Sequence, residues 1–324
     1  MIRAIDLVKK YIRTLRRDAR LAERTIISYE SDLLSFIKSV GEDKEMHQIS
    51  EIDIERFFTS VEGFQKLSES SIVRKASAVR GFYNYLEFNN IIIRSPIKRI
   101  PLKSIRRIPK PVLMSREETH LFFKTIEDEL RRLKHLGKKR LERGDPDSMI
   151  QYRIFCNTRN HLIFSLILTT GLKPGELSEL TNDQITIKQK KIEFNVYSKY
   201  ERKIAISDSH SQKLLKDYLR NIKESGFKSS YFFFNKNMGR LSTVMIQKIF
   251  RDYLAKSGIS RPLTPISLRH AFAVNLINQN VDMNVLRQSL GYKTFEGLLI
   301  YHSYFSSKKN NERRVKNNST ANSS

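Results

Sequence analysis

Residues 264–272 read TPISLRHAF, and residues 290–301 read LGYKTFEGLLIY. Pro265 fits the first position of a helix, so that Arg269 falls in the second turn. Tyr301 closes the second stretch. An arginine guanidinium can hold two phosphate oxygens, and a tyrosine hydroxyl can act as a nucleophile. Together the two stretches indicate a site for phosphoryl transfer.

The chain carries a large excess of positive charge. Among its 324 residues, 59 are Lys or Arg and 34 are Asp or Glu, which gives a formal net charge of +25. Such an excess favours a polyanionic partner, most often nucleic acid, although a soluble protein from a lysine-rich proteome would also be basic. Hydrophobic residues make up 40% of the chain, enough to build the cores of about two domains.

Several functional classes find no support in the sequence. The longest apolar stretch, residues 161–168, is too short to cross a bilayer, and the start, MIRAIDLVKK, lacks the pattern of a signal peptide. The single Cys156 excludes an intrachain disulfide and a multi-cysteine zinc site. We find no glycine-rich nucleotide loop, and the seven histidines follow no standard metal-ligand spacing. We therefore expect no cofactor, no metal, no membrane association, and a cytoplasmic, nucleoid-associated protein.

The first part of the chain is expected to be a helical bundle. Apolar residues recur at helical spacing in four segments, which begin near Ile5, Ile26, Asp53 and Ile72. The opposite faces carry basic residues: Lys9, Lys10, Arg13, Arg16, Arg17, Arg74, Lys75 and Arg80. We predict that residues 1–98 form a DNA-binding domain, while a solvated charged face is the alternative for any one helix.

A basic linker follows this bundle. Residues 91–112 read IIIRSPIKRIPLKSIRRIPKPV, and the prolines among the basic residues disfavour a helix or a central strand. We place an extended linker at residues 99–112 and a second domain at residues 113–305. The remainder, residues 306–324, has almost no apolar content and is expected to be a disordered polar tail.

The second domain is predicted to be mixed. Ser115 and Glu118 fit a helix capping box at its start. Residues 127–149 are highly charged, and we expect them to project as an inserted helix and loop. Residues 184–207 alternate between polar and apolar side chains, which indicates a meander of two or three strands. Further helices are expected at residues 160–170, 209–226, 242–257, 265–279 and 283–290.

The order of these features resembles the tyrosine recombinase or phage integrase family, with its Xer-like branch as the best match. The motifs are TGLKPGEL at 170–177, a β-meander carrying a lysine, TPISLRHAF, and Tyr301 nine residues after Tyr292. They are specific only in combination, and the resemblance covers about residues 5–305. It implies a mainly α fold. An N-terminal SAM-like core-binding bundle would precede an α+β catalytic domain with a small antiparallel sheet.

The resemblance also implies a chemistry without metal or nucleotide. Tyr301 would attack a DNA phosphodiester and form a 3′-phosphotyrosyl bond, which a 5′-hydroxyl later resolves. Tyr304 is a rival within one turn, and a buried structural tyrosine is a further alternative at this position. Arg269 would bind the scissile phosphate, Lys199 would be the general acid, and His270 would support packing.

Three positions depart from the family pattern. Lys173 replaces the arginine of the first box, which keeps the charge but loses the planar, two-pronged donor. Ile266 stands where a histidine or lysine is usual and offers no donor. Tyr292 replaces a histidine or tryptophan, and its hydroxyl could still donate. The catalytic set is therefore degenerate, with Tyr301, Arg269 and Lys199 retained.

Two functions of different classes remain open at this point. The first is a site-specific DNA recombinase, a strand transferase that acts in chromosome dimer resolution, plasmid resolution or element integration. The second is a weakened or inactive DNA-binding paralogue that serves as a partner subunit, favoured by Lys173 together with Ile266. A generic basic nucleic-acid binder would leave the ordered motifs unexplained. By resemblance, the partner is double-stranded DNA, bound by a homo- or hetero-tetramer on paired sites.

Overall fold

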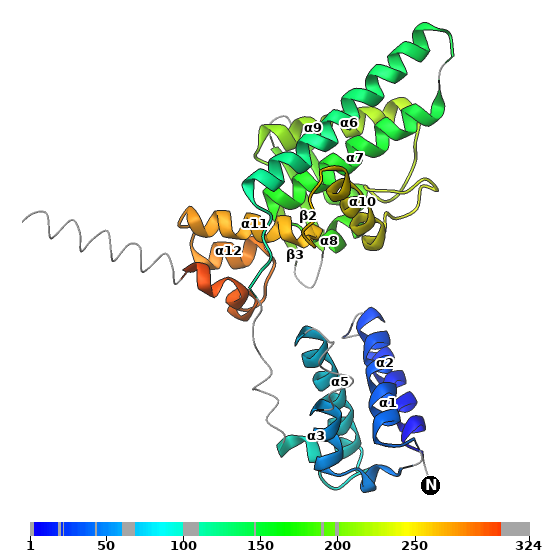
Figure 1. The fold of residues 1–324 in the computed structure, drawn as a ribbon, viewed down its shortest axis with the longest axis vertical. Coiled ribbons are helices and arrows are strands. Elements are labelled where there is room, and N and C mark those ends of the chain that lie inside the picture. The colour runs from blue at the N-terminus through cyan, green and yellow to red at the C-terminus, as the bar shows by residue number, and fades with distance from the viewer. Residues whose placement is uncertain are drawn as a thin grey trace, which may run out of the picture. The chain divides into compact units, whose positions relative to one another are not determined.

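The computed structural model describes residues 3–18, 21, 23–42, 44–59, 69–99, 110–145, 147–188, 191–197 and 201–305. The chain divides into two compact units, Met1–Ile108 and Pro109–Ser324 (Figure 1). Most of the expected linker and the expected polar tail lie outside the described residues. Within those residues, no helix is long and apolar enough to cross a membrane.

The N-terminal unit is a bundle of helices around an apolar core. The helices are α1 (Ala4–Asp18), α2 (Glu23–Val40), α3 (Glu51–Thr59) and α5 (Glu69–Phe88), with short 3-10 turns at Met46–Gln48 and Pro96–Arg99. Helix α2 packs against α1, α3 and α5. Leu33, Phe36 and Phe82 are fully buried at its centre. The predicted helical bundle is confirmed.

Two of the basic residues expected on its outer face have an internal role. Asp32 on α2 is 3% exposed, and Lys75 on α5 approaches its carboxylate to 3.0 Å. Arg74 makes a second ion pair with the same carboxylate and also donates to the Ser28 carbonyl. A buried carboxylate requires such compensation. Arg74 and Lys75 therefore join α5 to α2.

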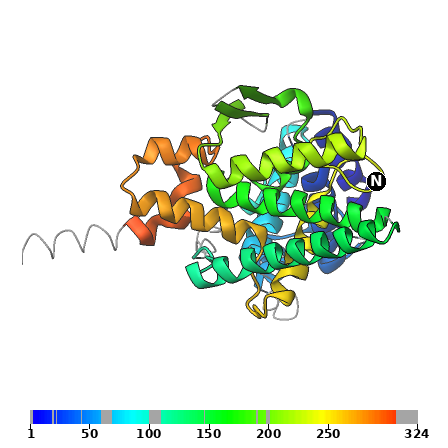
Figure 2. The same cartoon turned by 90° about the horizontal axis from the view of Figure 1, so that it is seen from above.

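The C-terminal unit is built around one long buried helix. Its helices are α6 (Arg116–Glu142), α7 (Ser148–Thr170), α8 (Pro174–Glu179), α9 (Ser209–Ser225), α10 (Thr243–Lys256), α11 (Pro265–Asn278) and α12 (Met283–Ser289), followed by the 3-10 segment η5 (Phe295–Tyr301). Helix α7 lies between α6 and α9 and also contacts α11 (Figure 2). It begins at Ser148, capped by Asp147, and not at Asn160 as the apolar run suggested.

The charged stretch at residues 127–149 is mostly helical. Helix α6 begins at the predicted capping box, in which Ser115 Oγ accepts from the Glu118 amide at 3.1 Å, and it continues without a break to Glu142. Leu133 and Gly137 are buried on the side that packs against α7. Because this face is apolar at helical spacing, the stretch contributes to the α6–α7 contact as well as to the charged surface.

The predicted meander is a three-stranded antiparallel sheet in the order β1 (Ile185–Lys188), β2 (Lys191–Tyr197) and β3 (Glu201–Ala205). In its register, Phe194 lies opposite both Ile185 and Ile204. Alternate side chains of β2 are buried in the core of this unit, as the period of two requires. The fold class predicted from the sequence, mainly α with a small antiparallel sheet, is confirmed.

Candidate active site

The site forms where α7, α11, α12 and η5 meet. Helix α7 ends at Gly171, which adopts a left-handed conformation with φ +68°. A Cβ at this position would lie 2.5 Å from the Phe272 ring, so a side chain is excluded both by conformation and by space. The chain therefore turns sharply at Gly171 and brings the TGLKPGEL stretch against α11.

Arg269 is buried in the middle of this junction, with 2% of its surface exposed. Its Nη1 donates to the Gly171 carbonyl, and its Nη2 donates to the Leu290 carbonyl at 2.6 Å. These bonds fix the guanidinium between the ends of α7 and α12. A guanidinium has five N–H groups, so hydrogens remain for a phosphate oxygen.

Tyr301 is the last residue of η5 and is fully buried. Its hydroxyl lies 2.8 Å from Nδ1 of His270. Burial, and then the charge of Arg269, lower the pKa of His270 to about 4, so the imidazole is neutral at neutral pH. Burial, and then Tyr292, raise the pKa of the Tyr301 hydroxyl, which therefore keeps its proton. A neutral imidazole with Nδ1 unprotonated can accept that proton.

Tyr292 packs against the guanidinium of Arg269. Its ring centroid is 5.4 Å from the guanidinium carbon of Arg269 and 5.8 Å from Nζ of Lys173. The ring lies directly against Gly297, where a Cβ would approach Tyr292 Cδ1 to 2.4 Å. A cation near an aromatic face is favourable, so the ring of Tyr292 interacts with both positive charges.

Lys173 belongs to a second charged group next to the first. It is the N-cap of α8, and its Nζ is 3.8 Å from Oε1 of Glu176. Glu176 is buried, and its two oxygens accept from the two terminal nitrogens of Arg202 on β3, at 2.9 and 2.8 Å. Burial opposes the charged carboxylate, but Arg202, the Lys173 amide and the Lys173 charge lower the pKa of Glu176 overall.

Arg202 connects this group to the Tyr292 segment. Gly291 has φ +62°, and a Cβ at this glycine would lie 2.5 Å from Nη1 of Arg202. The guanidinium therefore packs against the backbone immediately before Tyr292. Because Glu176 compensates the charge of Arg202, the net positive charge at this junction comes from Lys173 and Arg269, and such charge can stabilise a phosphoryl transition state.

The structure brings together four of the five site residues predicted from the sequence: Tyr301, Arg269, Lys173 and Tyr292. Lys199 lies outside the described residues, and its predicted role stays a prediction. Ile266 is half-buried in the first turn of α11.

Sequence reasoning missed two contacts. His270 was expected only to support packing, although its position next to Arg269 was a signal. Arg202 had no signal, because the sequence does not show that β3 faces Glu176.

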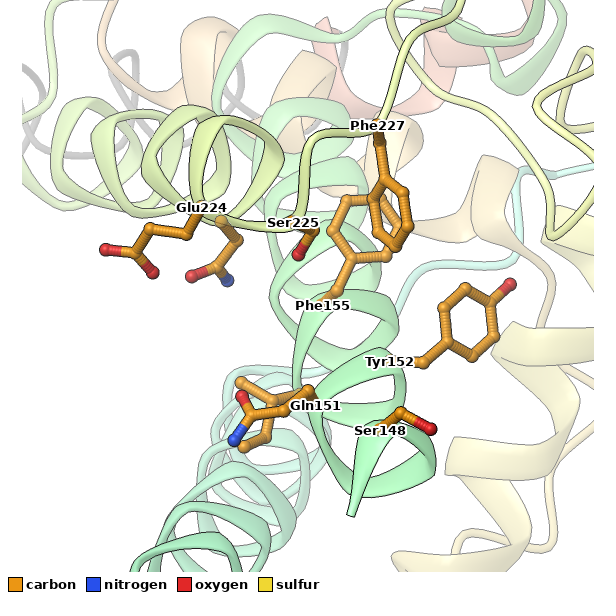
Figure 3. Close-up of a pocket in the computed structure, with 9 residues that line it drawn as sticks. Ser148, Gln151, Tyr152, Phe155, Glu224, Ser225 and Phe227 are labelled. Atoms are coloured by element: carbon orange, nitrogen blue, oxygen red, sulfur yellow. The ribbon is translucent and has the colours of Figure 1, made fainter. Parts of the chain in front are cut away.

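A separate cavity of about 530 Å³ lies at the other end of α7 (Figure 3). Its lining combines the first turns of α7 with the end of α9, including Tyr152, Phe155 and Phe227. Phe155 and Phe227 meet edge to face with ring centroids 5.0 Å apart. Among the described residues, Tyr301, Arg269, Lys173 and Tyr292 do not line this cavity.

The family model for the phage integrase family matches residues 139–307, which is more than half of the chain and contains every residue of the junction described above. The chain belongs to the phage integrase family. A model for the N-terminal SAM-like domain of phage integrases matches residues 8–89, within the N-terminal bundle. The tyrosine-recombinase resemblance predicted from the motifs is confirmed.

Relatives of similar length align with most of this chain. A tyrosine recombinase of Agathobacter rectalis is 24% identical over 296 residues, which span 91% of this chain and 90% of that protein. Tyrosine recombinase XerC of Lacticaseibacillus casei is 22% identical over 295 residues, which span 89% of this chain and 90% of that protein. Among solved structures, the XerH site-specific recombinase bound to a palindromic difH substrate, a post-cleavage complex, gives a TM-score of 0.70 at 18% identity. That match covers 96% of this chain and 85% of XerH.

Proposed function

We propose that this integrase-family chain is a site-specific DNA recombinase that cuts and rejoins DNA through a 3′-phosphotyrosyl bond to Tyr301. The observation that carries the proposal is the Tyr301 hydroxyl, 2.8 Å from the neutral imidazole of His270 and next to the buried Arg269. A protonated phenol is a weak nucleophile, and an adjacent base activates it. A buried structural tyrosine would also bond its hydroxyl, so the charge of Arg269 close to Tyr301 is what favours a catalytic role over a structural one.

The reaction can be written with every atom assigned. The Tyr301 oxygen attacks the scissile phosphorus while its proton passes to His270 Nδ1. The bond from phosphorus to the 5′ oxygen breaks, and that oxygen takes a proton from a general acid, for which Lys199 is the candidate. A 5′-hydroxyl then attacks the phosphotyrosine and gives its proton to the deprotonated general acid, while Tyr301 leaves and takes its proton back from His270. One phosphoester bond is exchanged for another, so no external energy source is needed.

The surrounding cations would stabilise the charge that develops on the phosphate. Arg269 is oriented by its two carbonyl bonds, so its geometry is set before DNA arrives. Lys173 stands where the family resemblance implies an arginine, and it brings a positive charge with three rotatable donors in place of the planar, two-pronged donor. Because Tyr301 is fully buried, η5 must shift before a phosphate can reach its hydroxyl. We therefore propose that DNA binding and exposure of Tyr301 are coupled.

The proposed partner is double-stranded DNA. The XerH structure contains a difH substrate. A lambda integrase dimer bound to a core site matches this chain with a TM-score of 0.66. The net charge of +25 supports a polyanionic partner for this chain as well. We propose that four protomers, identical or from two related chains, assemble on two paired sites.

Covalent trapping on a nicked duplex tests this function. The duplex carries a binding site selected by this protein from random-sequence DNA, and the nick lets the cleaved strand diffuse away. We expect a covalent adduct with the wild-type chain and none with Tyr301→Phe. Tyr304→Phe is the matched control, because Tyr304 is one turn further along and should leave the adduct intact. Specific binding without an adduct would show instead that the chain is a non-catalytic DNA-binding paralogue.

A further inference from the structure

Three potential metal ligands converge on one face of the C-terminal unit. Glu127 comes from α6, His161 from the middle of α7 and His210 from the first turn of α9, and their ligand atoms all lie within 4.8 Å of one another. The two Nε2 atoms are 3.4 Å apart, and Nε2 of His161 is 3.9 Å from Oε1 of Glu127. The three residues are distant in sequence, so the packing of α7 between α6 and α9 creates the cluster.

The spacing matches the needs of a tetrahedral ion. Ligand atoms at the usual Zn–N distance of about 2.0–2.1 Å are about 3.3 Å apart at the tetrahedral angle. The two imidazole nitrogens already meet this spacing, and the carboxylate of Glu127 is close to it. Glu127 is half-buried and His210 is exposed, so both side chains can make the small rotations that would complete the geometry.

The chemistry of His161 supports the same conclusion. Its ring is 2% exposed and is held in place by the packing of α7 between α6 and α9. Imidazole is a common ligand of transition-metal ions. Within the described part of the chain, its Nδ1 has no hydrogen-bond partner. Nε2, the atom that faces His210 and Glu127, is thus the ligand atom, while Nδ1 on the other side of the ring is left for a buried water.

We propose that Glu127, His161 and His210 bind one divalent transition-metal ion of the Zn²⁺ type. Two imidazoles and one carboxylate suit Zn²⁺, whereas Mg²⁺ and Ca²⁺ require mostly oxygen ligands. Water would occupy the fourth position. The ion would link α6, α7 and α9 and so stabilise the C-terminal unit. None of its ligands belongs to the Tyr301 site, so the proposal is independent of the recombination chemistry.

Direct titration of the full chain with Zn²⁺ tests the proposal. Chelator-treated protein is titrated calorimetrically, alongside His210→Ala, Glu127→Gln and His135→Ala. His210 is exposed, so its removal does not threaten folding. His135 is an exposed histidine on α6 and serves as the control for adventitious surface binding. We expect one Zn²⁺ per chain, a loss of affinity of at least about tenfold in the two cluster variants, and unchanged binding in His135→Ala.

Replacement of Zn²⁺ by Co²⁺ reports the geometry. We expect wild type and His135→Ala to give the intense visible absorption of tetrahedral Co²⁺, and the cluster variants to lose it. The thermal midpoint of the wild type should rise with Zn²⁺ concentration, and that of His210→Ala should not. Equal Zn²⁺ binding by wild type and His210→Ala would overturn the proposal, as would only weak, octahedral Co²⁺ absorption in the wild type.

Discussion

At the scale of single residues, few side chains of the candidate site can donate a hydrogen bond to a bound phosphate. Two nitrogens of Arg269 donate to backbone carbonyls, and the ring of Tyr292 packs against its guanidinium. Ile266 provides no donor. Lys173 is therefore expected to provide a large share of the remaining charge at the junction, although it is also held by Glu176 at 3.8 Å.

Replacement of Lys173 measures this share. We expect Lys173→Ala to slow strand cleavage by about 100-fold or more, the usual effect of removing one donor to a developing oxyanion. Lys173→Arg should retain cleavage or increase it, because arginine restores the planar donor. Single-turnover adduct formation on the nicked duplex gives both rates. Cleavage unchanged in Lys173→Ala would mean that this side chain does not contact the phosphate.

His270 gives a pH signature. Its pKa is about 4 in the folded chain and about 6.5 when unfolded, so the unfolded chain binds the extra proton between these values. Its contribution to stability is complete above about pH 6.5 and is lost as the pH falls towards 4. We measure the free energy of unfolding in urea at about pH 7 and at about pH 5. Between these two values it should fall less in His270→Asn than in wild type. An equal decline in both would refute a buried, neutral His270.

At the scale of elements, the buried pair between α8 and β3 joins a helix to a sheet strand. Glu176 is 4% exposed and Arg202 is 10% exposed, and the pair is bidentate. The sequence does not show that these two residues pair, because a strand and a helix become neighbours only when the chain folds. The same contact places Arg202 against Gly291, one residue before Tyr292.

Removal of Arg202 should be costly for this reason. Arg202→Ala leaves the buried Glu176 carboxylate without its main partner, and we expect a loss of about 3–5 kcal/mol in the free energy of unfolding. Arg202→Lys keeps the charge and should lose less. The double variant Arg202→Ala/Glu176→Gln should recover part of the loss, which a double-mutant cycle in urea would measure. A loss below about 1 kcal/mol in Arg202→Ala would contradict a buried, coupled pair.

At the scale of the whole molecule, the net charge of +25 is the dominant property. Part of that charge is used inside the protein, as the ion pairs of Arg74 and Lys75 with Asp32 show. On α1, Arg16 is held by Glu23 and Glu30, both at 3.1 Å, whereas Arg13 is exposed beside it. Net charge alone therefore overstates the surface available to a phosphate backbone.

DNA binding should respond steeply to salt. For about 6–10 phosphate contacts, we expect affinity to fall by about 10³–10⁵ between about 50 and 200 mM salt. If α1 faces the backbone, Arg13→Gln should reduce the logarithmic slope by about 1, and Arg16→Gln by less, because Arg16 is already paired. Filter binding across a salt series measures both slopes. A nearly flat salt dependence would exclude a mainly electrostatic interface.

The sequence by itself determined the fold class, the meander and the family, because hydrophobic period, capping residues and motif order are local properties of the chain. The motifs also predicted Tyr301, Arg269, Lys173 and Tyr292 as members of one site, and the folded chain brings these four side chains together. Only the tertiary structure showed that His270 reaches Tyr301, that Arg202 holds Glu176, and that Glu127, His161 and His210 meet. These contacts join residues on separate elements, and their partners are set by packing around α7, which no local pattern encodes.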